Sequence, residues 1–201
     1  RRLTEWYGFP TQEIEKAYEH GRARGSSSGK EQRGHQAVRW EPPRVDILLE
    51  GGEELLSGSG LRAMWTPGHT AGHLCVHDAL RRLLFSGDHI LPAITPHVSL
   101  DPGEEGDPLA SYEASLEGLR DLDVDTVHPA HEHSFPGLRA RVEEILDHHQ
   151  NRLQEILGQV VDGPKTPYQI SAGISWNVAP WNQLHPGTRR MALMETVAHL
   201  K

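Results

Sequence analysis

Short hydrophobic runs separated by glycine-rich and polar segments dominate residues 45–86 and predict a series of β-strands. The runs are Val45–Leu49, Leu61–Thr66, Leu74–His77 and Arg82–Ser86. Only a short turn around Asp78 separates the last two, so we expect them to pair as an antiparallel hairpin. This stretch is therefore predicted to be a series of short strands that includes one hairpin.

Beyond residue 100 the hydrophobic positions recur every three or four residues, as they do in helices. Asp107 and Pro108 are typical of a helix start. The hydrophobic side of that helix consists of Leu109, Tyr112, Leu116 and Leu119. A buried strand follows at Val124–Val127, and then a long helix from Leu138 that we expect to stop at Gly158. A hairpin followed by helix, strand and helix predicts an α/β fold.

Both ends of the chain carry further helical signals. Thr11 can cap a short helix, and the Gly/Ser-rich residues 21–36 predict a polar loop. Thr166 and Pro167 are typical of another helix start, and a second helix is predicted from Thr188. Its inward side would consist of Met191, Met194, Val197 and Ala198. We therefore expect two units, an α/β unit of residues 1–160 and a small winged-helix-like helical unit of residues 161–201.

The composition fits a folded domain. The chain has 201 residues, of which 36% are hydrophobic and 24% charged. The net charge of −8 argues against strong general nucleic-acid binding. No run of 18 apolar residues is present, the first residues do not resemble a signal peptide, and the single cysteine, Cys75, excludes an internal disulfide. These features predict no membrane span and a cytoplasmic location.

Fourteen histidines are an unusual number for this length, and they direct attention to metal sites. Three stretches place such residues directly after a predicted strand. They are T-P-G-H-T-A-G-H at 66–73, F-S-G-D-H at 85–89 and H-P-A-H-E at 128–132. Each one alone is weak evidence, because a histidine after a strand is usually structural. Side chains at strand ends are nevertheless held rigidly, as a metal site requires.

In this order and with these flanks, the three stretches resemble the metallo-β-lactamase-fold hydrolases over residues 45–157. The resemblance implies an α/β fold of the αββα sandwich type. It also implies that His69 binds a first metal ion, that Asp88 bridges two ions as the catalytic carboxylate, and that His131 binds the second. His73 and His128 would contact the substrate or support the ligands. Two zinc or similar divalent ions are implied as cofactors.

The family's H-x-H-x-D-H motif, which lies on the N-terminal side of these residues, is absent. His20 and His35 do not have its spacing. Together with a first residue other than methionine, this absence predicts that the chain is the C-terminal portion of a longer protein, or the ordered part of one; a natural remnant of the fold is the alternative. With three of the usual ligands, the chain alone should hold metal poorly and have low activity.

The resemblance extends to a bacterial subgroup similar to the lactamase-β-like-2 ribonucleases, which end in a winged-helix-like unit. We therefore expect a metal-dependent hydrolase that acts on an ester, thioester or phosphodiester of a small molecule or of RNA. An endoribonuclease is one alternative. A non-catalytic binding module with an incomplete metal site is another. A homodimer is compatible with the sequence.

Overall fold

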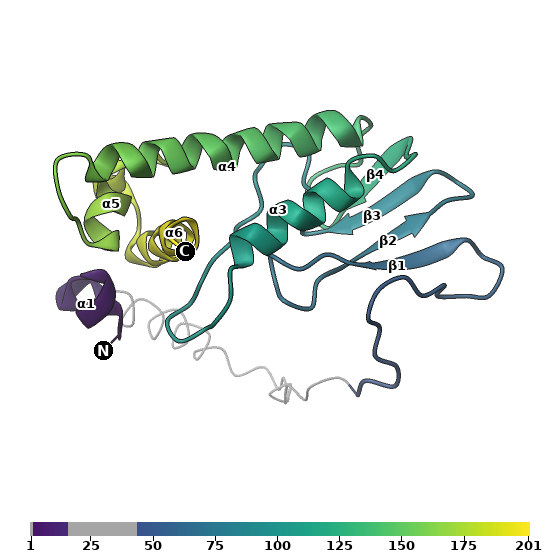
Figure 1. The fold of residues 1–201 in the computed structure, drawn as a ribbon, viewed down its shortest axis with the longest axis horizontal. Coiled ribbons are helices and arrows are strands. Elements are labelled where there is room, and N and C mark those ends of the chain that lie inside the picture. The colour runs from purple at the N-terminus through teal and green to yellow at the C-terminus, as the bar shows by residue number, and fades with distance from the viewer. Residues whose placement is uncertain (1, 16–43) are drawn as a thin grey trace, which may run out of the picture.

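The computed structural model describes residues 2–15 and 44–201, and its order of elements follows the predicted α/β pattern (Figure 1). The polar loop predicted at 21–36 lies outside the described residues, as do His20 and His35. The elements are α1 (Arg2–Tyr7), β1 (Leu61–Trp65), β2 (Leu74–Asp78), β3 (Leu83–Gly87), α3 (Pro108–Leu119), β4 (Thr126–Pro129), α4 (Leu138–Val160), α5 (Pro167–Gly173), the 3₁₀ helix η1 (Trp181–Gln183) and α6 (Pro186–His199).

The four strands form one sheet in the order β1-β2-β3-β4. The predicted hairpin is confirmed, because β2 pairs with β3 in antiparallel register with Val76 opposite Phe85. β1 is antiparallel to β2, and β3 is parallel to β4. Consequently β1, β3 and β4 all run in the same direction, and the loops that follow them leave the sheet at the same edge.

The strand predicted at Val45–Leu49 is wrong, because these residues have no regular structure. Val45, Ile47 and Leu48 are 64%, 78% and 84% exposed. The carboxylate of Glu53 instead accepts hydrogen bonds from the amides of residues 50 and 51 and bends the chain locally. A short hydrophobic run does not form a strand unless a neighbouring strand pairs with it.

Helices α3 and α4 cover one face of the sheet, and the main hydrophobic core lies between them and the strands (Figure 1). The predicted start of α3 is confirmed, because Asp107 accepts a hydrogen bond from the amide of Ala110 at 2.9 Å. Tyr112 is fully buried, and its hydroxyl donates a hydrogen bond of 2.6 Å to the carbonyl of His89. Cys75 is buried in the same core, as its place within a strand predicted.

Helix α4 continues to Val160, so the predicted stop at Gly158 is wrong. A glycine inside a helix costs only about 1 kcal/mol, which tertiary contacts can offset. One such contact is the hydrogen bond from the Gln159 side chain to the carbonyl of Gly173 at the end of α5. The first half of α4 packs on the sheet, whereas its second half extends to α5 and α6 (Figure 1).

The C-terminal helices form a second packed cluster that includes the N-terminal residues. Thr166 and Gln169 form a capping box that starts α5, as predicted. Phe9 packs in one hydrophobic cluster with Leu193 of α6. The prediction that Met191 faces inward is wrong, because its side chain is 50% exposed. Residues 161–201 contain helices and no strand. The winged-helix interpretation is not confirmed, and the boundary at residue 160 stays a prediction.

None of the helices in the described ranges combines the length and the apolar composition needed to cross a lipid bilayer.

Candidate functional site

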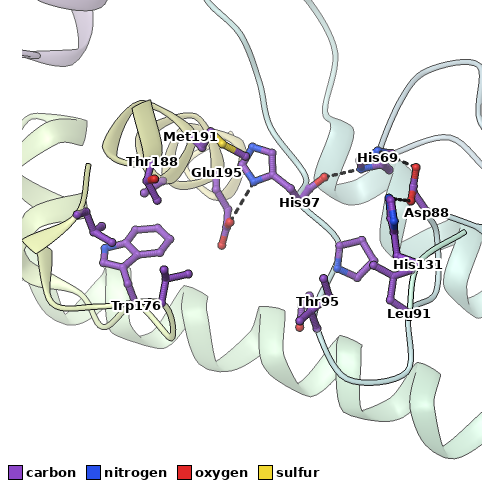
Figure 2. A pocket seen from close by; sticks show the side chains of 15 residues that line it. His69, Asp88, Leu91, Thr95, His97, His131, Trp176, Thr188, Met191 and Glu195 are labelled. Atoms are coloured by element: carbon purple, nitrogen blue, oxygen red, sulfur yellow. Dashed lines mark hydrogen bonds and ion pairs between the residues drawn. The ribbon is translucent and has the colours of Figure 1, made fainter. Parts of the chain in front are cut away.

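The loops after β1, β3 and β4 bring His69, Asp88 and His131 together (Figure 2). The Nε2 atom of His131 lies 3.2 Å from Oδ1 of Asp88, and Nε2 of His69 lies 4.0 Å from Oδ2. The parallel direction of the three strands explains why residues so far apart in sequence meet at one edge. The carboxylate of Asp88 therefore has an imidazole nitrogen beside each of its two oxygens.

The orientation of His69 is fixed by a second contact. Its Nδ1 lies 2.8 Å from the main-chain carbonyl of His97, which can only accept, so Nδ1 carries the proton. In the neutral imidazole Nε2 then has a free lone pair, and this lone pair is on the atom nearest Asp88. A second hydrogen bond of this kind commonly orients histidines that bind metal ions.

The distances around Asp88 are compatible with metal coordination. Bonds from zinc to imidazole nitrogen and carboxylate oxygen are about 2.0–2.2 Å, so neighbouring ligand atoms on one tetrahedral ion stand roughly 3.3 Å apart. The separations of 3.2 and 4.0 Å bracket that value. Oδ1 of Asp88 is also buried and accepts no hydrogen bond within the described part of the chain.

The described side chains do not complete a metal site. Within residues 2–15 and 44–201, no three histidine, cysteine or carboxylate side chains form a group that could hold a metal ion. His69, Asp88 and His131 supply two ligand pairs that share Asp88. Their donor atoms suit zinc, but further ligands would be needed for full coordination.

His73 contacts the backbone of Asp88. Its Nε2 accepts a hydrogen bond from the Asp88 amide at 3.2 Å, and its Nδ1 lies 2.8 Å from the hydroxyl of Thr66. Burial and the nearby His69 lower the pKa of His73, so its ring stays neutral and can accept this bond. Gly87 has a φ of +55°, and a Cβ there would stand 2.7 Å from the His73 ring. His73 thus holds the loop that carries Asp88.

His128 lies on the other face of the sheet from the core. Its ring stacks on Phe85 at 5.3 Å, and its Nδ1 lies 2.7 Å from the hydroxyl of Ser134. Side chains alternate along β4, so the burial of Val127 in the core directs its neighbour His128 outward. His128 is the one predicted site residue that these contacts place away from Asp88.

Sequence reasoning missed a further polar pair, His97 and Glu195. Nδ1 of His97 lies 3.3 Å from Oε2 of Glu195 on α6, and Oε1 of Glu195 lies 3.9 Å from Nε of Arg152. Burial alone would raise the pKa of the Glu195 carboxyl, but His97 and Arg152 hold it below its ordinary value. Nothing in the sequence connects residues 97 and 195. Only the four-residue spacing of Met191 and Glu195 shows that both lie on one side of α6.

A cavity of about 520 Å³ adjoins the three candidate ligands and reaches to α6 (Figure 2). His69, Asp88 and His131 lie at one end, and Trp176, Thr188 and Met191 lie at the other. The apolar side chains that line it are Leu91, Ile94, Pro96, Trp176, Val178, Leu184, Met191 and Ala192. Its volume is in the usual range for small-molecule sites.

Comparison with known proteins gives consistent results. The family profile described as the Metallo-beta-lactamase superfamily matches residues 2–131. A "Beta-lactamase-like protein 2 homolog" from Caenorhabditis elegans is 32% identical over 57% of this chain and 36% of its own length. An "Atrochrysone carboxyl ACP thioesterase" from Aspergillus fumigatus is 26% identical over 63% of this chain and 38% of its own length.

Solved structures show the same fold. A metallo-beta-lactamase family protein from Thermus thermophilus superposes with a TM-score of 0.66 and 30% identity. This match covers 99% of the chain and 60% of the other protein. The chain thus spans little more than a third of the two curated relatives, and three fifths of this structural relative.

Proposed function

Because this chain belongs to the metallo-beta-lactamase superfamily and has its fold, we propose that it is a metal-dependent hydrolase whose site contains His69, Asp88 and His131. The observation that carries this proposal is the position of Asp88, with an imidazole Nε2 atom near each carboxylate oxygen. A carboxylate in this position can be shared by two divalent ions, and neutral imidazoles favour zinc. Ligands outside the described residues would complete the coordination.

Each side chain has a separate part in this proposal. When bound, divalent ions supply Lewis acidity that assists attack by water on a carbonyl or phosphoryl centre. His69 and His131 would hold the ions, and Asp88 would be shared between them. The carbonyl of His97 fixes the tautomer of His69, and His73 positions the loop of Asp88.

The pocket favours a carboxylic ester or thioester over an RNA phosphodiester. None of the described residues that line it is a lysine or arginine, and Glu195, which lies away from the candidate metal ligands, is acidic. Proteins that bind nucleic acids neutralise the phosphates with basic side chains. The name of the relative from Aspergillus fumigatus, an ACP thioesterase, supports a thioester substrate. In this proposal the helices of residues 161–201 form one wall of the pocket. That these helices are a winged-helix-like unit is also part of the proposal.

The proposal is tested by measuring hydrolysis of simple phenyl esters and thioesters by the full chain with added zinc. We expect slow hydrolysis that depends on zinc and is lost in Asp88→Asn, which keeps the size of the side chain but removes its charge. His128→Gln is the matched control and should keep the wild-type rate. Zinc-independent hydrolysis, an active Asp88→Asn variant, or no hydrolysis at any zinc concentration would each contradict the proposal.

A further inference from the structure

The pocket beside Asp88 has apolar walls from two distant parts of the chain. Leu91, Ile94 and Pro96 come from the segment between β3 and α3. On the opposite side, Met191 belongs to α6 and Trp176 to the segment before it. The two walls meet only in the folded chain, so no local sequence pattern indicates the pocket.

Several of these apolar side chains are open to solvent. Ile94 is 55% exposed, Val178 is 80% exposed and Met191 is 50% exposed. Exposed apolar side chains that gather around one concave site are typical of a surface that a ligand covers. An apolar ligand of moderate size would bury them and gain hydrophobic free energy.

The polar groups of the pocket are confined to defined positions. The candidate ligands occupy one end, and the pair of His97 and Glu195 lies between that end and Trp176 (Figure 2). Arg141 holds the wall at Leu91 and Ile94 by hydrogen bonds of 2.7 and 2.9 Å to their carbonyls. This wall is therefore fixed in place rather than free to collapse into the cavity.

Away from the candidate metal ligands, the charge of the pocket selects against anionic ligands. Its described lining contains the carboxyl groups of Asp88 and Glu195 and no side chain with a permanent positive charge. Beside Glu195, a neutral hydrocarbon chain avoids the repulsion that a phosphate or a second carboxylate would meet. Both the charge and the apolar walls thus favour a hydrocarbon chain.

We propose that this pocket binds the hydrocarbon part of an acyl ester or thioester, with the acyl carbonyl at the end that holds Asp88. The inference rests on the proposed hydrolase function and adds the substrate class to it. In the reaction, the oxygen of water bonds to the acyl carbon and the bond from that carbon to the ester oxygen or thioester sulfur breaks. The leaving alcohol or thiol takes up one proton of the water, and no oxidation or reduction occurs.

Binding of neutral methyl ketones tests the pocket without relying on catalysis or metal. The probes are 2-butanone, 2-hexanone and 2-octanone, which have a carbonyl and a growing chain but cannot be hydrolysed. Their affinities for the full chain are read from NMR shifts of the Trp176 indole N–H in the presence of a chelator. Each buried methylene should strengthen binding roughly fourfold. We therefore expect 2-octanone to bind at least about tenfold more tightly than 2-butanone.

Two variants test whether the hydrocarbon part of the ketone binds in this pocket. Met191→Gln keeps length and helix propensity but makes the pocket wall polar, and it should reduce the preference for 2-octanone to below about threefold. Leu157→Gln is the matched control, because Leu157 is a similarly exposed apolar residue of α4 that does not line the pocket. This control should keep the wild-type preference.

Equal affinities for the three ketones, or a preference that survives Met191→Gln, would overturn the acyl pocket. Neither result would bear on the proposed hydrolase function, which is tested by zinc-dependent hydrolysis. Conversely, a chain-length preference without hydrolysis would support the pocket and contradict the hydrolase.

Discussion

The imidazole of His69 donates a hydrogen bond of 2.8 Å from Nδ1 to the main-chain carbonyl of His97. This bond joins the loop after β1 to the pocket wall between β3 and α3. The side chain of His97 in turn contacts Glu195 of α6, so a continuous set of contacts runs from a candidate metal ligand to the C-terminal helix. The C-terminal helices therefore help to position the candidate site as well as to enclose the pocket.

Replacing Glu195 should destabilise the fold more than replacing an ordinary surface acid. Glu195→Ala leaves the buried guanidinium of Arg152 without this partner and removes the contact to His97. We expect a loss of about 1–3 kcal/mol in the free energy of unfolding, measured by urea denaturation.

Glu117→Ala is the control, because Glu117 makes an exposed ion pair with Arg120 on the surface of α3. Its loss should cost less than about 0.5 kcal/mol. Equal effects of the two substitutions would show that Glu195 does not connect the two parts of the molecule.

The loop that carries Asp88 depends on Gly87. Gly87 has a φ of +55°, and an added Cβ would stand 2.7 Å from Nε2 of His73. Gly87→Ala should displace His73 and Asp88, and should weaken zinc binding, measured by calorimetry, by at least about tenfold.

Gly72→Ala provides the comparison, because a Cβ at Gly72 meets no atom within 4 Å. We expect this variant to bind zinc like the wild type. Unchanged zinc affinity in Gly87→Ala would show that the conformation of this loop does not matter for the site.

The buried histidines predict a stability that falls in acid. Burial lowers the pKa of His89 and of His149 to about 3, whereas both groups titrate near the ordinary value of 6.5 when unfolded. Between these values the unfolded chain binds more protons than the folded chain. Stability is therefore full above pH 6.5 and falls as the pH drops below it, by up to about 1.4 kcal/mol per pH unit for each histidine.

Urea denaturation at several values between about pH 7.5 and about pH 4.5 measures this slope. His149→Phe should reduce it by about one proton, because one buried titrating group is removed. His133→Gln replaces an exposed histidine and should leave the slope unchanged. A slope that is the same in all three proteins would show that buried His149 does not contribute to acid sensitivity.

The sequence predicts the fold well where local signals agree with packing. The hairpin of β2 and β3 and the Asp107 cap of α3 follow from turn chemistry and hydrophobic period, and the structure confirms both. The prediction of a strand at residues 45–49 is wrong because a strand needs a pairing partner as well as a hydrophobic run. The helix stop at Gly158 is wrong because contacts from residues far along the chain outweigh the low helix propensity of glycine.

The sequence likewise indicated some residues of the candidate site and missed others. Strand-end positions drew attention to the three stretches, and the family resemblance selected His69, Asp88 and His131 from them. The structure brings these residues together because three strands of equal direction end at one edge of the sheet. His97 and Glu195 gave no such signal, since their contact joins segments 98 residues apart. The pocket was missed for the same reason: its walls come from separate parts of the chain, and Met191 was expected to face inward.

Zinc titration of the full chain by calorimetry tests the central claim most directly, with Asp88→Ala, His131→Ala and His128→Ala compared under the same conditions. We predict weak binding by the wild-type chain that falls by at least about tenfold in Asp88→Ala and in His131→Ala. His128→Ala should bind like the wild type, because His128 stacks on Phe85 at the other face of the sheet. Equal affinities in all four proteins, or no binding by the wild-type chain, would contradict the claim that Asp88 and its two neighbouring histidines form part of a metal site.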